Sequence, residues 1–303
     1  MSELTKRVLF AVVAAPVVIW AMLAGRAPLA ALLAVVAALG AWEFYRLARA
    51  SGGAPLGEAG IVLAGLLPLA VHAHYEQVYT VPTAVGAVAV LALCAAAIWL
   101  RGVAGRPLAS VAITVFGVLY TAGMLSYMYA LRYHPYVAPF ENAAGVGEVP
   151  ALGGWRIPLG GLLLLLPILL TWASDIGAYF VGRALGRRKL IPSVSPGKTV
   201  AGAVGGVLAS VLVAWLYVAF VLRPIGQLGL SPLGIVLFGV VVSVAAQVGD
   251  LFESLLKREA NVKDSSRLLP GHGGILDRFD SLLFVLPVAY PLVGWLLRAA
   301  PHG

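Results

Sequence analysis

The sequence predicts an all-α integral membrane protein, and its composition, its long apolar runs and its scarcity of charge lead to that class. Of the 303 residues, 61% are hydrophobic and only 11% are charged, which is more apolar side chain than a soluble domain of this length can hide from water. Several apolar runs approach the roughly 20 residues that an α-helix needs to cross a bilayer. Because backbone groups in lipid must find partners within their own segment, we expect these runs to be helices.

Nine runs are candidate membrane spans. They cover residues 8–24, 27–45, 57–73, 81–100, 109–131, 157–181, 200–222, 231–250 and 281–297. The first follows Lys6 and Arg7 and resembles a signal peptide, but it continues past any clear cleavage site, so we interpret it as a retained helix. The third is the weakest, because Pro55 and Pro68 interrupt a short run. The segment 133–156 has the composition of an external loop.

The charges between the runs predict the orientation of the chain. With the N-terminus in the cytoplasm, sixteen of the 21 Lys and Arg residues lie on the cytoplasmic side, as the positive-inside rule favours. An odd number of spans then places the C-terminus outside. The net charge of +8 is thereby explained by topology and phosphate binding, and we expect no nucleic-acid partner. The single cysteine, Cys94, excludes an intramolecular disulfide and a cysteine-based zinc site.

The stronger of two polar clusters runs from Gly249 to Asp280, between the eighth and ninth predicted spans. Its first four members share one face of a helix, because they follow the spacing i, i+3, i+4, i+7. They are Asp250, Glu253, Ser254 and Lys257. The cluster continues through Lys263-Asp264 and the glycine-rich turn Pro270-Gly271-His272-Gly273-Gly274 to Asp277-Arg278-Phe279-Asp280.

These residue types suit the binding of a nucleotide. Carboxylates are ligands for Mg²⁺, which usually takes one or two of them together with phosphates and water. A glycine-rich turn lets backbone N–H groups approach a phosphate, and lysine and arginine match its charge. The plain alternative is a solvated helix end, in which Glu253 and Lys257 form an i, i+4 pair worth about 0.2–0.5 kcal/mol. The gathering of charges at a membrane edge favours function.

The second cluster begins inside the sixth predicted span with Asp175 and Arg183, two turns apart on one helix. A buried Asp175 would be costly without a partner. The cluster ends with Ser195-Pro196-Gly197-Lys198-Thr199 at the start of the seventh span, and a helix N-terminus is a natural anion site. This stretch lacks the upstream glycines of a Walker P-loop. Helix capping and positive-inside arginines are an equally good explanation.

At this point the residues resemble the signature of the phosphatidate cytidylyltransferases. The signature residues are Ser254-x-Leu256-Lys257-Arg258, Lys263-Asp264 and Pro270-x-His272-Gly273-Gly274-Ile275-x-Asp277-Arg278-Phe279-Asp280. The second cluster, the stretch Trp42-Glu43-Phe44-Tyr45-Arg46 and the nine-span layout are similar to the same family. One position departs from it, because Ala201 stands where the family usually has a glutamate.

The resemblance implies an activity, a cofactor and a location. The expected reaction transfers CMP from CTP to phosphatidic acid and gives CDP-diacylglycerol and pyrophosphate. It requires Mg²⁺, alone or with a second cation. The expected location is the inner (cytoplasmic) cell membrane, where the protein meets membrane lipids and a homodimer is compatible with the family. We expect one polytopic domain over 1–303, with N-terminal helices in 1–156 and catalytic helices in 157–303.

The candidate residues form a polar site between the C-terminal helices at the cytoplasmic side. Asp250, Asp277, Lys263, Asp264 and His272 are expected to take part in the reaction, with Asp250, Asp277 and, as a less certain third, Asp280 as metal ligands. The residues expected to bind substrate are Asp175, Arg183, Ser195, Lys198, Thr199, Ser254, Lys257, Arg258, Gly273, Gly274 and Arg278.

Three other functions compete with this interpretation. A CTP-dependent lipid kinase would share the spans and the nucleotide site but release CDP. A transporter would line a path with its charges, yet it would not need them concentrated on one face. A CDP-alcohol phosphotransferase is disfavoured, because its spaced Asp-Gly, Ala-Arg and Asp pattern is not found.

Overall fold

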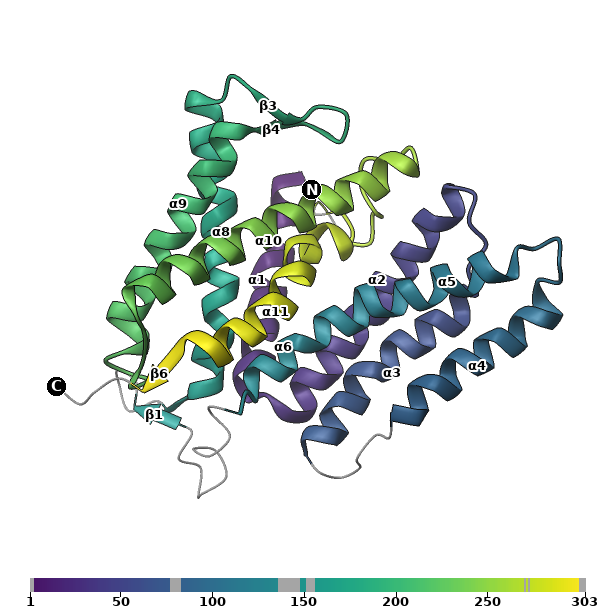
Figure 1. Ribbon diagram of the computed structural model, residues 1–303, viewed down its shortest axis with the longest axis horizontal. Coiled ribbons are helices and arrows are strands. Elements are labelled where there is room, and N and C mark those ends of the chain that lie inside the picture. The colour runs from purple at the N-terminus through teal and green to yellow at the C-terminus, as the bar shows by residue number, and fades with distance from the viewer. Residues whose placement is uncertain are drawn as a thin grey trace. The chain divides into compact units, whose positions relative to one another are not determined.

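The computed structural model describes residues 3–76, 83–135, 148–150, 156–269, 271 and 273–299, and nearly all of their regular structure is helical (Figure 1). The helices are α1 Glu3–Ala24, α2 Arg26–Ala50, α3 Gly57–Tyr75, α4 Thr83–Leu100, α5 Pro107–Val118, α6 Met124–Arg132, α8 Leu159–Leu185, α9 Val200–Tyr217, α10 Pro232–Glu259 and α11 Leu276–Leu296. Two π-helical turns, η1 Leu119–Gly123 and η2 Val218–Leu222, follow α5 and α9.

Short strands form three two-stranded antiparallel ribbons. Strand β1 (Glu148–Pro150) pairs with β2 (Arg156–Pro158), β3 (Lys189–Ile191) with β4 (Ser195–Thr199), and β5 (Leu228–Leu230) with β6 (Leu297–Ala299). Most of the expected loop 133–156 lies outside the described residues, but its last part contributes β1 and the first residue of β2. Each ribbon therefore joins two segments that flank helices, and the strands form no larger sheet in the described chain.

Seven helices in the described chain are long and apolar enough to cross a membrane, and two shorter apolar helices cover 12–24 and 84–100. These findings confirm a helical, multi-pass membrane protein. Several helices extend beyond the predicted apolar spans: α2 continues to Ala50, α8 to Leu185 and α10 to Glu259, as the spacing of Asp250 to Lys257 predicted for α10, and α11 already begins at Leu276. Hydropathy predicts only the apolar part of a helix, whereas the backbone hydrogen bonds continue through the polar residues that flank it.

The chain divides into two compact units. The first unit contains residues 1–129 and 255–279, and the second contains 130–254 and 280–303. The chain passes between them within α6, within α10 and again within α11. The polar cluster from Gly249 to Asp280 therefore has residues in both units.

In the first unit, α2, α3 and α5 are held together around Tyr45. This side chain is fully buried, and its hydroxyl donates to the backbone oxygen of Thr114 at 2.7 Å. A Cβ atom at Gly60 or Gly117 would collide with the Tyr45 ring. Small residues that allow close helix approach are typical of membrane proteins, because lipid supplies no hydrophobic drive for helices to associate. The packing fixes α2, which carries Glu43 and Arg46.

In the second unit, α8 and α9 pack face to face through glycines. A Cβ atom at Gly202 would lie 2.7 Å from the backbone oxygen of Ala178, so no larger residue fits there without displacing the backbone. The Ser174 and Ser243 hydroxyls, 2.7 Å apart, join α8 to α10, and Ser210 donates to the Gly239 oxygen at 3.0 Å. Polar contacts of this kind stabilise helix pairs in membranes. They fix the part of α10 that leads to Asp250.

Candidate functional site

In the second unit, Lys198 and Asp250 form an ion pair. The Lys198 Nζ atom lies 2.6 Å from Oδ2 of Asp250, and the two side chains are 26% and 34% exposed. The Ser254 hydroxyl approaches the other carboxylate oxygen from the next turn of α10, at 3.4 Å. Lys198 reaches this place from strand β4, which folds back on β3. The ribbon and α10 thus bring together two residues that the sequence assigned to separate clusters.

Thr199 follows Lys198 and begins helix α9. Its side-chain oxygen accepts a hydrogen bond from the Gly202 amide at 3.1 Å, which is the usual contact of an N-cap residue. Thr199 is also buried. The capping explanation considered for this stretch is therefore correct for Thr199, whose side chain stabilises the end of the helix next to Lys198.

Asp175 and Arg183 both lie on an accessible side of α8. Asp175 keeps accessible surface on α8, and it lies close enough to Lys198 and Asp250 to interact with both electrostatically. Arg183 is also exposed and donates to the Tyr179 hydroxyl at 2.9 Å. An apolar run does not reveal which side of its helix packs against protein, and this side of α8 is open. Asp175 adds a second carboxylate near Lys198.

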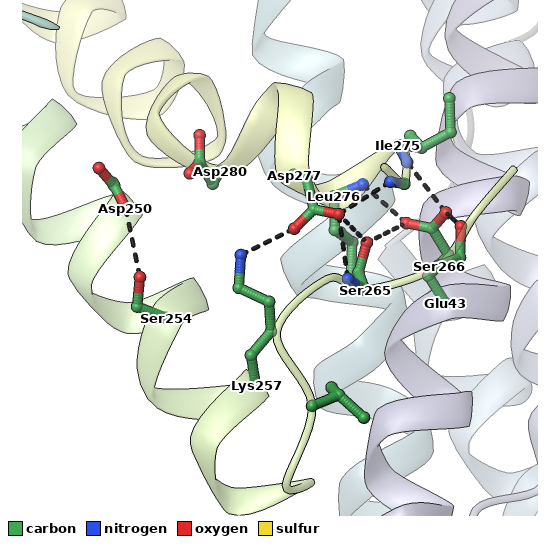
Figure 2. Close-up of polar contacts among 12 residues, drawn as sticks. Glu43, Asp250, Ser254, Lys257, Ser265, Ser266, Ile275, Leu276, Asp277 and Asp280 are labelled. Carbon is green, nitrogen blue, oxygen red and sulfur yellow. Dashed lines mark hydrogen bonds and ion pairs between the residues drawn. The ribbon is translucent and has the colours of Figure 1, made fainter. Parts of the chain in front are cut away.

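Asp280 lies on α11, in the same unit as Asp250. A Cβ atom at Gly249 would be 2.6 Å from the Asp280 backbone oxygen, so α10 and α11 touch beside both carboxylate residues. Figure 2 shows Asp250 and Asp280 on these two helices. One Asp280 oxygen accepts a hydrogen bond from the Ser281 amide at 2.6 Å. Two carboxylates at one helix crossing fit the one or two that Mg²⁺ usually takes from a protein.

In the first unit, Asp277 occupies the first turn of α11 and accepts hydrogen bonds at both oxygens (Figure 2). Lys257 donates to Oδ1 at 2.7 Å, and these two side chains are only 13% and 7% exposed. Oδ2 receives the Gly274 amide at 2.8 Å and both the amide and the hydroxyl of Ser265, at 3.0 and 2.9 Å. Asp277 is therefore the centre around which the loop before α11 is folded.

Glycines make this loop possible. Gly271 and Gly273 have φ angles of 74° and 82°, which side chains rarely adopt, and a Cβ atom at Gly273 would lie 2.8 Å from the Asp277 carboxylate. The sequence suggested that the amides of this turn hold a phosphate. In the structure the Gly274 amide instead donates to Asp277, because that carboxylate is the nearest strong acceptor. His272 lies outside the described residues.

Glu43 is a polar residue whose importance the sequence analysis missed. It is fully buried on α2, and its carboxylate accepts four hydrogen bonds. The donors are the hydroxyls of Ser265 and Ser266, at 2.9 and 2.5 Å, and the amides of Ile275 and Leu276, at 2.9 and 2.8 Å. The available signal was an acidic residue inside a predicted membrane span, where ionisable groups are functional candidates.

The remaining candidates lie on the surface of their units. Lys263, Asp264, Arg258 and Arg278 are exposed, and Arg258 donates to the Val262 backbone oxygen at 3.3 Å. Exposed cations can reach a bound anion without breaking a buried contact. Within the described part of the chain, no three His, Cys, Asp or Glu side chains are grouped closely enough to hold a metal ion.

The helices and the paired charges together define a multi-pass membrane protein with a charged site. The sequence pattern of the cytidylyltransferase family matches residues 5–296, and the chain belongs to that family. It is 33% identical over 303 residues to phosphatidate cytidylyltransferase of Synechocystis sp., with 97% of each chain covered. It is 48% identical over 125 residues to phosphatidate cytidylyltransferase of Bacillus subtilis, which is 41% of this chain and 45% of the relative. The corresponding enzyme of Haemophilus influenzae is 46% identical over 132 residues, 43% of this chain and 45% of the relative.

We expect Lys257 and Asp277 to be strongly coupled in stability. Asp277→Asn and Lys257→Met each leave one polar partner in a poorly hydrated place, and breaking a buried pair costs about 3–5 kcal/mol. The double variant should lose less than the sum of the two, by about 0.5–3 kcal/mol. Denaturant unfolding of the purified protein in detergent measures the cycle. Arg278→Met, an exposed neighbour, serves as the control, with a change within about 0.5 kcal/mol. Strict additivity would contradict the pair.

Proposed function

We propose that this chain is a CTP:phosphatidate cytidylyltransferase, which makes CDP-diacylglycerol and pyrophosphate in phospholipid biosynthesis. The family match over residues 5–296 carries the proposal, because it covers the helices and both ion pairs. The Synechocystis relative, whose name states this activity, aligns with the chain from end to end. The two lysine–carboxylate pairs add support, since a reaction between two phosphate groups needs cations placed beside anionic ligand sites.

The proposed reaction is a displacement at phosphorus. An oxygen of the lipid phosphate forms a bond to the α-phosphorus of CTP, the bond from that phosphorus to the bridging oxygen breaks, and pyrophosphate leaves with the electron pair. The lipid phosphate is already an anion, so the reaction needs no strong general base. Its barrier comes from bringing two anions together, and the enzyme lowers it by placing cations around both and aligning them.

Lys198 and Lys257 are the cations that the proposal places closest to the reacting groups. Lys198 forms an ion pair with Asp250, Lys257 donates to Asp277, and in the proposal each ammonium group turns from its carboxylate to a phosphate oxygen. Arg258, Lys263 and Arg278 are exposed and contact the outer phosphates in this scheme. Arginine suits such contacts because its planar fork donates two parallel hydrogen bonds.

Asp250 and Asp277 are the proposed ligands for Mg²⁺, with Asp280 as a third candidate. When bound, Mg²⁺ would supply positive charge to the phosphates and orient them. Asp250 is one-third exposed, forms an ion pair with Lys198 and has a long contact with the Ser254 hydroxyl. Oδ2 of Asp277 already accepts up to three hydrogen bonds, so Asp277 would bind a cation through Oδ1, after Lys257 turns away.

The proposed membrane arrangement has nine spans, counting α1 and α4, with the N-terminus and the charged site in the cytoplasm. Its support is the excess of Lys and Arg in alternate loops and the cytosolic supply of CTP that the proposed reaction uses. The membrane would be the inner cell membrane. A homodimer remains compatible with the family, and CTP, phosphatidic acid and the surrounding lipids are the proposed partners.

The products decide between the proposed activity and a lipid kinase. Purified full-length protein incubated with CTP, phosphatidic acid and Mg²⁺ should release one pyrophosphate for each CDP-lipid formed. A kinase would release CDP and phosphorylate a lipid alcohol. Formation of CDP with diacylglycerol or an isoprenoid alcohol, and no pyrophosphate with phosphatidic acid, would refute the cytidylyltransferase assignment.

Asp250→Asn tests the metal proposal, because it preserves shape and removes the charge that would hold the cation. We expect kcat to fall by about a hundredfold or more and the Mg²⁺ concentration for half-maximal rate to rise. The Asp250→Asn, Asp277→Asn double variant should lose little more than the worse single one, since residues that act as a unit are non-additive. Glu259→Gln, the same loss of a carboxylate charge at an exposed position of α10, is the matched control and should change neither value. An unchanged Mg²⁺ requirement in Asp250→Asn would rule out a ligand role.

Cysteine labelling tests the orientation. The native Cys94 is replaced by alanine, and single cysteines are placed at Gly197, where the structure has open space, and at the exposed Arg267. Neither position should react with an impermeant thiol reagent in intact cells, and both should react after permeabilisation. A cysteine at the exposed Pro224, in a predicted outside loop, should react in intact cells. The reverse pattern would invert the topology.

A further inference from the structure

Glu43 lies near the end of the predicted span 27–45, and its buried carboxylate accepts four hydrogen bonds. Its oxygens each accept one hydroxyl and one backbone amide. A charge removed from water is costly unless charge-assisted hydrogen bonds replace its hydration. Four donors provide that replacement, and all four come from the segment 265–276. The buried carboxylate therefore depends on this segment for its hydrogen-bond donors, and the segment depends on the carboxylate as the acceptor.

Two of the donors are the amide of Ile275, just before α11, and the amide of Leu276, the first residue of α11. The first amides of any helix lack partners within the helix, and a Ser, Thr, Asp or Asn at the N-cap usually supplies one. Ile275 precedes the helix and has no side-chain oxygen. Glu43 supplies the missing acceptor from another helix, and its charge also suits the positive end of the α11 dipole. The start of α11, and with it Asp277, is thus tied to α2.

Ser265 connects Glu43 to Asp277. Its hydroxyl oxygen lies 2.9 Å from a carboxylate oxygen of each residue, but a hydroxyl has one proton and can donate to only one of them at a time. Its amide donates to Asp277, and its backbone oxygen accepts from Arg46, one turn beyond Glu43 on α2, at 3.2 Å. Ser265 is itself fully buried. Ser265 is therefore bound by Glu43 and Arg46 of α2, and it also donates hydrogen bonds to Asp277.

We propose that Glu43 is a positioning residue for the reaction. It fixes the position of the Asp277 carboxylate through Ser265 and through the start of α11. The inference deepens the proposed cytidylyltransferase activity and rests on it. When Lys257 leaves Asp277 for a phosphate, the Ser265 proton can turn to Glu43, so Asp277 can engage a cation while the buried hydroxyl keeps an acceptor. Ser265 thereby lets the Asp277 carboxylate change partners without unfolding the loop.

Glu43→Gln tests this role in the full-length protein. An amide has one acceptor oxygen, and its NH₂ group must face an amide N–H or a hydroxyl that now donates to Glu43. We expect hydrogen exchange of the amides in 265–276 to quicken, and kcat to fall by about tenfold or more with a much smaller change in KM for CTP, since misplacement affects the reacting geometry most. Glu58→Gln, the same change at an exposed position of α3, should alter neither.

A second comparison separates positioning from general damage. Ser265→Ala and Glu43→Gln should have non-additive effects on kcat, because both act on Asp277 along one route. If Glu43→Gln does not fold, Ser266→Ala is used, which removes one donor to Glu43 and leaves the charge in place. It should quicken exchange and lower kcat in the same direction, by less.

The outcomes are distinguishable from failure of the proposed activity. Exchange is measured without substrate, so it tests the anchor even if the wild-type protein makes no CDP-lipid. Unchanged exchange in Glu43→Gln or Ser266→Ala would overturn the anchor. Faster exchange with an unchanged kcat would overturn the positioning role, as would additive effects of Ser265→Ala and Glu43→Gln.

Discussion

The Asp277 carboxylate is the interaction on which the polar loop depends. The conformation of the loop follows from donors that converge on this one group: Lys257 and the amides of Ser265 and Gly274. Each of these donors would lose a strong acceptor if Asp277 moved, and a buried donor without an acceptor costs about 1–3 kcal/mol. The glycine at 273 is then obligatory, since a side chain there would occupy the space that the carboxylate needs.

The carboxylates described here differ in how they are compensated, and the difference matches their proposed roles. Glu43 is fully buried and meets only neutral donors in fixed positions, which suits a structural anchor. Asp277 is nearly buried and meets one mobile cation beside fixed amides. Asp250 is one-third exposed and is paired chiefly with a lysine from a strand. Ease of exchanging partners increases along this series, from anchor to ligand site.

The sequence predicted the fold class because hydropathy reports directly which segments prefer lipid. It also predicted which segments carry the polar site, because charges at membrane edges are few. It missed the partnerships, since these join residues far apart in the chain. Glu43 and Ser265 are separated by 222 positions, and no local pattern indicates that they meet. The hydrogen bond from the Gly274 amide to Asp277 was missed for a related reason. The amides of a glycine-rich turn can donate equally to a phosphate or to a carboxylate of the protein.

Electroneutrality accounts for the pairing of lysines with carboxylates in a protein that must bind two anions. An unpaired lysine at a membrane edge would be poorly hydrated, and its pairing with a carboxylate removes that cost while no substrate is bound. In the proposed reaction the substrates bring negative charge and Mg²⁺ brings positive charge. Each lysine can then turn from its carboxylate to a phosphate, and the carboxylate would hold the metal cation, which would supply the compensating positive charge. A site with lysines alone would repel Mg²⁺, and a site with carboxylates alone would repel the phosphates. Paired residues therefore keep the resting site stable and keep the cost of substrate entry low.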